Sequence, residues 1–503
     1  MVTNFNRSRT NPLNMLSYDE IPYTQNIYQQ TQPNTLATLA ILRDHLPPAI
    51  SHCRVLELGC AQGNNLIAMA QTIPHGFFVG IDHSATQIAA GNALIAQLHL
   101  VNIQLKCLDL QTITPEFGTF DYIIIHGVYS WVAPPVREKL LAICRDNLQP
   151  QGIAYLSYNT YPGWQSDEML REILLFHLQQ ITSPIERLKK AKQLLKSLSD
   201  SIALRYDNYA LSLKNKLQHL LQLPDNYFAH EHLEEYNDAV FFHQFIQQVQ
   251  RYDLHYLTDL QTYMDNSLWD ENSEDFIAQQ QYQDFLSNRR YRETLLCRRE
   301  IASPPQLNYR KIKELSLSAA LKTTATLSQI LSADSVSFDN FAGKTVAAVS
   351  LPSLKAVCYC LSQIYPKSLN FQEIIDLIQQ DYAFQVDTED EDEILHFLFN
   401  LFLTKDLELY CYPPNFCFTV SSHPVASPLA RLQSLQGEAV TNLRGETFWL
   451  DKITNLLLQS LDGQHSHSQI LSRLNKQLTD NLFSPSQLQQ RLKYLACQAF
   501  LVS

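Results

Sequence analysis

The pattern of apolar positions first predicts a strand, a turn and a helix between residues 53 and 70. The apolar residues Val55, Leu56 and Leu58 precede a turn that contains Gly59 and Gly63, and helical spacing of apolar residues follows over Leu66–Met69. Glycine lets the backbone turn sharply, and the free N–H groups at the start of a helix attract polar groups of a ligand. This order of elements is typical of the nucleotide-binding corner of an open α/β sheet.

Further strand patterns follow at regular intervals and predict a Rossmann-like α/β sheet. They cover residues 77–81, 102–110, 120–132 and 152–160, with helical patterns between them. The 120–132 segment has a nearly continuous apolar body, as expected of a parallel strand that is covered on both faces.

Acidic residues stand at the ends of these predicted strands. Asp82 follows Gly59 by roughly twenty residues, the interval at which a carboxylate binds ribose hydroxyls. Asp109 ends the third strand, where it could accept a hydrogen bond from an adenine amino group. Glu57 would repel a pyrophosphate but suits a positively charged ligand, such as S-adenosylmethionine.

Five segments carry a resemblance to a known family. They are SYDEIPY (Ser17–Tyr23), ELGCAQGNNL (Glu57–Leu66), HGVYSWV (His126–Val132), SYNTYPGW (Ser157–Trp164) and HEHLEEYNDAVFFHQF (His230–Phe245). The chain resembles class I S-adenosylmethionine-dependent methyltransferases that carry a methyltransferase regulatory domain, a group that includes the rickettsial-type protein lysine methyltransferases of outer-membrane proteins. The resemblance implies S-adenosylmethionine as cofactor and direct transfer of its methyl group to a lysine side chain of a protein substrate.

Two sets of site residues are expected. In the resembling family the N-terminal arm lies over the cofactor, so two tyrosines of this arm are included in the cofactor-binding set. The members of this set are Tyr18, Tyr23, Glu57, Gly59, Cys60, Ala61, Gly63, Asn65, Asp82, His83, Asp109, Leu110, His126 and Gly127. The catalytic set lies just past the fourth and fifth strands, because ligands of open parallel sheets bind beyond the carboxyl ends of the strands. Its members are His126, Tyr129, Trp131, Tyr158, Asn159 and Trp164. A structural role, in which these aromatic residues only pack the rim of the site, is the alternative.

The expected domains are an N-terminal arm over 1–34, a catalytic domain over 35–165, a helical regulatory insertion over 166–250 and a winged-helix-like α+β region over 301–503. The sheet is expected to be completed within 251–300, because an edge left open after the fifth strand would be unpaired. Strand patterns at 253–260 and 291–298 supply the two missing strands. The insertion would then roof the active site; in the competing interpretation, residues 166–300 form an independent helical domain.

Within the C-terminal region, two helix patterns followed by a predicted hairpin at Leu407–Val420 suggest the winged helix. The last eighty residues are interpreted as a further helical unit. The arginines at 289–299 are expected to form a solvated face with local ion pairs, and an acidic peptide site is the alternative. The histidines at His230–His232 and His465–His467 are expected at the surface or at helix caps, so no metal site is predicted.

Composition narrows the class of partner. A net charge of −12 over 503 residues argues against nucleic acid as the main partner. No apolar stretch approaches the roughly 20 residues that span a bilayer, and the polar start lacks an apolar signal core. These features predict a cytoplasmic protein without a membrane partner; a homodimer is left open. Two alternative functions stand beside protein methylation, namely methylation of a small molecule and cofactor-dependent regulation without turnover.

Overall fold

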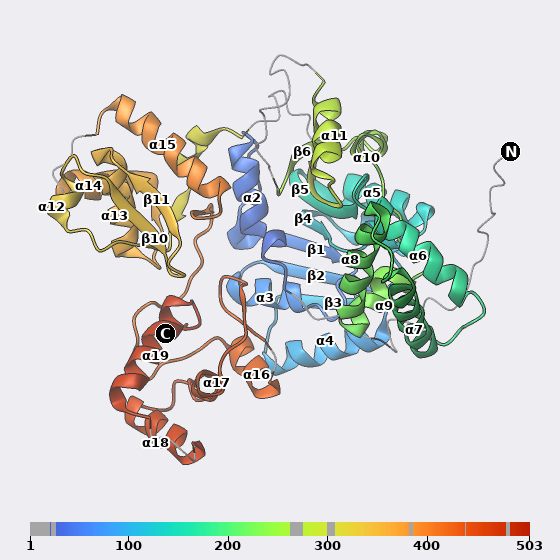
Figure 1. Ribbon diagram of the computed structural model, residues 1–503. Helices are drawn as coiled ribbons and strands as arrows, with labels where there is room; N and C mark the ends of the chain where they lie inside the picture. The colour runs from blue at the N-terminus through green and yellow to red at the C-terminus, as the bar shows by residue number, and fades with distance from the viewer. Residues whose placement is uncertain are drawn as a thin grey trace.

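A seven-stranded sheet forms the centre of the computed structural model, which describes residues 21, 27–261, 275–298, 307–381, 386–437, 439–478 and 483–502 (Figure 1). The strand order is β3-β2-β1-β4-β5-β7-β6. The strands are β1 (Arg54–Leu58), β2 (Phe77–Asp82), β3 (Ile103–Cys107), β4 (Phe120–Ile125), β5 (Leu148–Asn159), β6 (His255–Asp259) and β7 (Tyr291–Cys297).

The first five strands are parallel, and β7 closes the edge that β5 would otherwise expose. β7 pairs antiparallel with β5, from Ile153↔Cys297 to Asn159↔Tyr291, and β6 pairs antiparallel with β7. The prediction that two strands return after the helical insertion to complete the sheet is confirmed. The competing interpretation of 166–300 as an independent helical domain is wrong.

Helices cover both faces of the sheet because side chains alternate along each strand. Val55 points into the hydrophobic core on one side, and Leu56 and Leu58 point into the core on the other. The first core is covered by α2 (Pro33–Leu42), α3 (Asn64–Thr72) and α4 (Ala85–Gln97), and the second by α5 (Pro134–Asn147), α10 (Phe242–Gln250) and α11 (Phe276–Ser287).

The insertion between β5 and β6 is helical, as its sequence predicts. Its helices are α6 (Gln165–Leu178), α7 (Pro184–Ile202), α8 (Asn208–Gln222) and α9 (Asp225–Leu233), followed by α10. The first four share a hydrophobic core of their own, to which Leu174, Leu195, Leu217 and Phe228 contribute.

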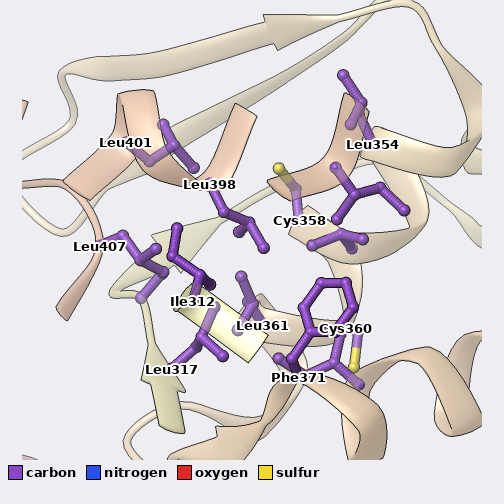
Figure 2. Packing of buried hydrophobic residues seen from close by; sticks show 14 of the residues in the cluster. Ile312, Leu317, Leu354, Cys358, Cys360, Leu361, Phe371, Leu398, Leu401 and Leu407 are labelled. Carbon is purple, nitrogen blue, oxygen red and sulfur yellow. The ribbon is translucent and has the colours of Figure 1, made fainter. Parts of the chain in front are cut away.

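Residues 307–411 form a second body with its own core (Figure 2). Leu317, Leu361 and Leu398 meet in this core from a strand and two helices. Its elements are β8 (Ser316–Ser318), β9 (Leu321–Lys322), α12 (Leu327–Ile330), β10 (Val336–Asn340), β11 (Thr345–Val349), α13 (Pro352–Ile364), β12 (Leu369–Asn370), α14 (Phe371–Asp381), α15 (Thr388–Leu403) and β13 (Glu408–Tyr410).

A third body follows, so the single region expected over 301–503 contains two hydrophobic cores. The hairpin predicted at 407–420 is wrong, because β13 pairs with β8 and no strand follows between 411 and 420. The elements of the third body are α16 (Pro428–Gln436), β14 (Val440–Thr441), β15 (Thr447–Phe448), α17 (Lys452–Gln459), α18 (His467–Gln477) and α19 (Pro485–Cys497). Gln71 of α3 anchors this body to the sheet domain through hydrogen bonds with Ser427 and with the backbone N–H of Leu429.

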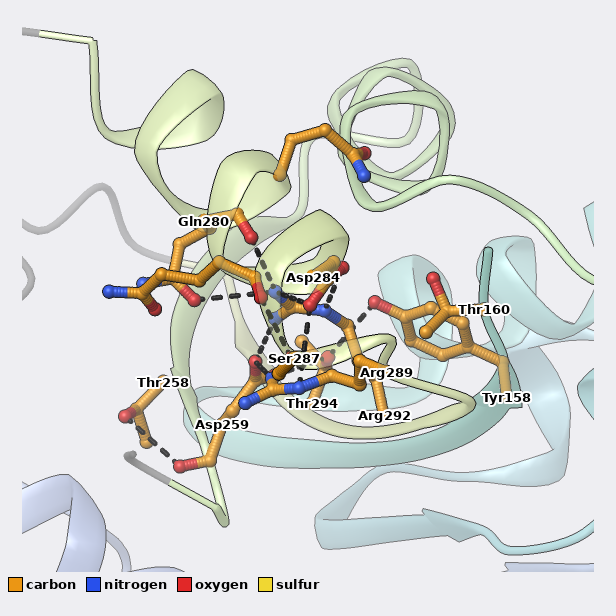
Figure 3. Close-up of polar contacts among 12 residues, drawn as sticks. Tyr158, Thr160, Thr258, Asp259, Gln280, Asp284, Ser287, Arg289, Arg292 and Thr294 are labelled. Atoms are coloured by element: carbon orange, nitrogen blue, oxygen red, sulfur yellow. Dashed lines mark hydrogen bonds and ion pairs between the residues drawn. The ribbon is translucent and has the colours of Figure 1, made fainter. Parts of the chain in front are cut away.

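Of the arginines expected on a solvated face, Arg290 and Arg298 are exposed, whereas Arg289 and Arg292 instead hold strand β7 to its surroundings (Figure 3). Arg292 is fully buried and pairs with Asp259 of β6 and with Asp284 of α11, whose Oδ1 lies 2.8 Å from Nη2. Arg289 lies within ion-pair distance of the same two carboxylates. Burying charge this deeply is costly without such compensation, so the network fixes α11 and β6 against β7. Arg299 lies outside the described residues.

In the part of the chain that the structure describes, no helix combines the length and the apolar character needed to cross a bilayer.

Candidate active site

A cavity of about 1040 Å³ opens at the carboxyl ends of the parallel strands β1 to β5. Three parts of the chain line it: the strand ends, Tyr28 of the N-terminal arm, and the end of the insertion with Tyr227, Glu231 and Tyr236. The volume is at the upper end of the range for small-molecule sites, so the cavity has room for a nucleotide cofactor together with the end of an acceptor side chain.

The turn between β1 and α3 forms the floor of this cavity and depends on its glycines. Gly59 and Gly63 have positive φ angles of +77° and +73°. A Cβ on Gly59 would lie 2.4 Å from Cγ2 of Val128, and one on Gly63 would lie 2.7 Å from the Leu105 side chain. Both the backbone conformation and the space therefore require glycine.

Glu57, at the end of β1, is a buried carboxylate that lines the cavity. Its side chain is 4% exposed, and Oε1 accepts a hydrogen bond of 2.9 Å from Nδ2 of Asn65. Oε2 is buried and has no partner among the described residues. Burial, with a contribution from the charge of Asp82, raises the pKa of Glu57 to about 8. An unpartnered oxygen of this kind fits a ligand that brings a cationic or hydrogen-bond-donating group.

Asp82 ends β2 with its carboxylate turned back to the turn. Its two oxygens accept hydrogen bonds of 2.9 Å from the backbone N–H groups of Ala61 and Ser84. Each oxygen retains a second lone pair for a ligand hydroxyl. Asp109, after β3, accepts from the N–H of Gln111 and lines the next part of the cavity.

A chain of hydrogen bonds holds the proton of His126, after β4, on Nδ1. The Tyr155 hydroxyl donates to Oε1 of Glu293 at 2.7 Å, so its oxygen accepts from Nδ1–H of His126 at 2.9 Å. The Nε2 of His126 then carries a lone pair. Burial lowers the pKa of His126 to about 4, which keeps the ring neutral. The ring of Tyr28 packs on it with 3.8 Å between ring centroids.

The helical insertion supplies the roof. His230, at the end of α9, bonds through Nε2 to the carbonyl oxygen of Ile21 at 2.6 Å and through Nδ1 to Glu234. Its neighbour Glu231 is 9% exposed, and burial raises its pKa to about 7. Arg290 lies over the ring of Trp164, 5.6 Å from its centroid, and pairs with Asp167 at 3.0 Å.

Most of the residues expected from the sequence line this one cavity. They are Glu57, Gly59, Cys60, Ala61, Asn65, Asp82, His83, Asp109, Leu110, His126, Gly127, Trp131, Asn159 and Trp164. Gly63 lies just behind the lining as the N-cap of α3. Tyr18 and Tyr23 lie outside the described residues.

Two expected catalytic residues lie elsewhere. Tyr158 is fully buried on the opposite face of β5 from Ser157 and Asn159, stacked on Phe245 with 4.1 Å between centroids. Its hydroxyl lies 3.2 Å from that of Thr294 (Figure 3). Tyr129 is buried in the same core, where it bonds to Gln248. The expectation that these rings face an acceptor is contradicted, because the alternation of β5 turns Tyr158 away from the cavity and Tyr129 packs beside it.

The sequence interpretation missed part of the lining, namely Tyr28, Tyr227, His230, Glu231, Tyr236, Arg290 and Tyr291. The expectation of exposed or capping histidines at 230–232 is wrong, since His230 and His232 are both buried. A signal was present, because the segment HEHLEEY combines three charged or titratable side chains in a row within a helix that otherwise shows little amphipathic pattern.

Models of known protein families match three parts of the chain. A methyltransferase domain matches residues 55–152, a predicted methyltransferase regulatory domain matches residues 224–298, and the PKMT C-terminal winged helix domain matches residues 422–496. The winged helix therefore corresponds to the third body and not to the hairpin expected at 407–420. Together with the sheet and its cavity, these matches define an S-adenosylmethionine-dependent methyltransferase of class I.

The relatives extend over nearly the whole chain. Protein RP789 of Rickettsia prowazekii is 31% identical over 478 residues, which cover 91% of this chain and 85% of that protein. The chain belongs to the same family as RP789. Protein RP028 of the same organism is 37% identical over 47% of this chain and 95% of its own length. The solved structure of PKMT2 from Rickettsia typhi superimposes with a TM-score of 0.84 at 26% identity, covering 96% of this chain and 100% of PKMT2. PKMT2 has also been solved in complex with AdoHcy, and that structure superimposes with a TM-score of 0.82.

Proposed function

We propose that this methyltransferase transfers a methyl group to the side-chain amine of lysine in a protein substrate. The observation that carries the proposal is the acceptor side of the cavity, where aromatic rings of Tyr28, Trp164 and Tyr227 accompany the buried carboxylate of Glu231. Ring faces and a desolvated carboxylate both favour a cationic group over a neutral one.

The floor of the cavity suits the cofactor. The unpartnered Oε2 of Glu57 would face the amino group of its methionine part, Asp82 its ribose hydroxyls, and Asp109 with Leu110 its adenine. When bound, S-adenosylmethionine supplies a methyl group bonded to a positively charged sulfur. A nitrogen lone pair can attack that methyl group while the C–S electron pair stays on sulfur.

The protein then has to exclude water and provide a neutral amine. Tyr28 covers the site from the N-terminal arm, where its backbone N–H bonds to Asn65 at 3.1 Å, and α9 covers it from the insertion. His126 remains uncharged beside the acceptor, so it adds no repulsion toward an incoming cation.

The choice of a protein over a small molecule is supported by the third body. Residues 422–496 match the PKMT C-terminal winged helix domain, and the solved structure of PKMT2 superimposes on 96% of this chain. The two further bodies together offer a large surface beside the catalytic domain, which suits a protein substrate (Figure 1).

The test uses the purified full chain with S-adenosylmethionine that carries an isotopically labelled methyl group. We expect label on lysine side chains of candidate bacterial surface proteins, located by peptide mass spectrometry, and none when those lysines have first been acetylated. Label confined to small amines, or to side chains other than lysine, would contradict the proposal. Bound cofactor with no labelled product in any extract would instead favour a regulatory protein without turnover.

A further inference from the structure

We infer that Glu231, which the helical insertion places in the cavity, binds the acceptor amine as an ammonium ion and takes the proton that must leave before transfer. This inference rests on the proposed function and assigns its acceptor subsite to one carboxylate.

The position of Glu231 supports this role. It lies in the last turns of α9, and only 9% of its surface is exposed, yet it lines the cavity. Among the described residues, none makes a hydrogen bond or an ion pair with its carboxylate, in contrast to Asp167, which pairs with Arg290 and Lys216. A buried carboxylate that faces a cavity and has no protein partner is suited to a cation from outside.

The backbone around Glu231 is fixed to the end of β5. Its own carbonyl oxygen accepts a hydrogen bond of 2.7 Å from Nδ2 of Asn237, whose Oδ1 accepts one of 2.7 Å from Nδ2 of Asn159. Arg171 of α6 donates to the carbonyl oxygen of Glu235 at 2.9 Å. Asn159, expected to be catalytic, thus also acts as a positioning residue for the roof.

The surrounding charges leave the carboxylate able to exchange a proton near neutral pH. Burial raises the pKa of Glu231 to about 7, with the charge of Asp167 adding to the rise and those of Arg290 and Arg171 opposing it. Tyr227 and Tyr291 also face it, while burial lowers the pKa of the adjacent His232 to about 3, so this ring stays neutral. His230, on the same helix, is held by Ile21 and Glu234.

The proton step balances within this site. One N–H bond of the lysine ammonium breaks, its electron pair stays on nitrogen as the attacking lone pair, and the proton goes to a Glu231 oxygen. In water the lysine pKa is about 10.4, and desolvation in the cavity lowers it toward that of the carboxyl group. The carboxyl group releases the proton to solvent when the product leaves.

The test compares two cofactor analogues, so it needs neither turnover nor the natural substrate. Sinefungin carries an amine where the transferred methyl group would be, whereas S-adenosylhomocysteine carries nothing there. Both share the amino acid, ribose and adenine parts, so the contribution of Glu57 cancels in the ratio of their affinities. That ratio, measured by calorimetry on the full chain, therefore reports the acceptor side alone.

In the wild-type protein we expect tighter binding of sinefungin than of S-adenosylhomocysteine. Glu231→Gln should lower this preference by at least roughly tenfold, the value of a charge-assisted hydrogen bond, while leaving the affinity for S-adenosylhomocysteine unchanged. Glu235→Gln, which removes the same charge outside the cavity lining, should leave the preference intact. The wild-type preference should also decline from about pH 8 to about pH 6, as the carboxylate of Glu231 is protonated, and the decline should vanish in Glu231→Gln.

The outcomes separate this inference from the proposed function. An unchanged preference in Glu231→Gln, with S-adenosylhomocysteine still bound, overturns the role of Glu231 and leaves the methyltransferase site standing. Loss of S-adenosylhomocysteine binding in Glu231→Gln alone would show that this carboxylate contacts the cofactor and would overturn its role toward the acceptor. Failure of the wild-type protein to bind either analogue would overturn both.

Discussion

Replacing Glu57 by glutamine should abolish the pH dependence of cofactor binding. In the free protein, burial raises the pKa of Glu57 to about 8, and its Oε2 has no partner among the described residues. A ligand amino group that faces this oxygen binds the ionised carboxylate more tightly than the neutral carboxyl group. Binding therefore becomes linked to the loss of a proton from Glu57.

The magnitude follows from the ionised fraction. About half of the Glu57 side chains are ionised at pH 8, roughly one in ten at pH 7 and roughly one in a hundred at pH 6. If the ligand binds only the ionised form, its apparent affinity falls by up to ~10-fold per pH unit below 8. The α-amino group of the ligand remains protonated over this range, so the slope belongs to the protein.

The same pKa shift has a defined effect on stability. The folded protein binds the Glu57 proton more tightly than the unfolded chain, so the free energy of unfolding contributed by this group declines as pH rises from the unfolded pKa toward 8. Glutamine cannot ionise, so the variant without ligand should lose less stability over this range. The ligand should stabilise the wild-type protein most at the alkaline end.

The assay is calorimetric titration of S-adenosylhomocysteine at pH 6, 7 and 8 with wild-type protein, Glu57→Gln and the exposed control Glu138→Gln. We expect a steep rise in affinity with pH for the wild type and the control, and a flat profile for Glu57→Gln. An equal slope in all three proteins would show that Glu57 is not the linked group, and the electrostatic account of the cavity floor would fail.

Three further variants test the packing around the site. Arg292→Met should lower the free energy of unfolding by about 3 kcal/mol in chemical denaturation, because it leaves two buried aspartates with only the longer ion pairs to Arg289. A loss no larger than that of a surface ion pair would refute this network. Tyr158→Phe should cost about 1 kcal/mol of stability and leave kcat unchanged, since its hydroxyl bonds inside the core; a lower kcat with normal stability would restore its catalytic role. Gly91→Ala would place a Cβ 2.2 Å from the carbonyl oxygen of Gln62, so it should cost about 1–3 kcal/mol and weaken S-adenosylhomocysteine binding in calorimetry; unaltered binding would mean that the cofactor turn tolerates displacement.

The floor of the site could be predicted because its chemistry is local in the sequence. Glu57, Gly59 and Gly63 lie within one strand and one turn, and Asp82 ends the next strand. Parallel strands bring their carboxyl ends to one edge of the sheet, so residues at these ends are predicted to lie near a ligand. The return of β6 and β7 could also be predicted, because β5 would otherwise leave an unpaired edge.

The direction in which a side chain points at a strand end was harder to predict from the sequence. Tyr158 and Asn159 are neighbours in the sequence, yet a strand turns successive side chains to opposite faces. Both residues were expected to reach the acceptor, although they lie within the strand pattern of 152–160, and β5 extends through Asn159 in its pairing with β7. The alternation along β5 therefore places Tyr158 in the core and Asn159 in the cavity.

Buried charge could not be predicted because its compensation is distant in sequence. Arg292 is paired by Asp259 and Asp284, which become its neighbours only when β6 and α11 pack on β7. Nothing in the local sequence distinguishes it from Arg298, which is exposed in the structure. The burial of His230 could not be predicted either, because its partner Ile21 belongs to the N-terminal arm, which is distant in the sequence.

The roof and the floor of the cavity are linked by the topology of the chain. The insertion leaves the sheet at the end of β5 and returns at β6, so its helices begin at the edge where the cofactor turn lies. Any substrate that shifts α9 must also strain the hydrogen bonds from Asn159 through Asn237 to Glu231, because these join the roof to β5. The insertion is thereby placed to make transfer depend on what occupies the acceptor side, which gives a physical meaning to a regulatory segment that contributes residues to the site itself.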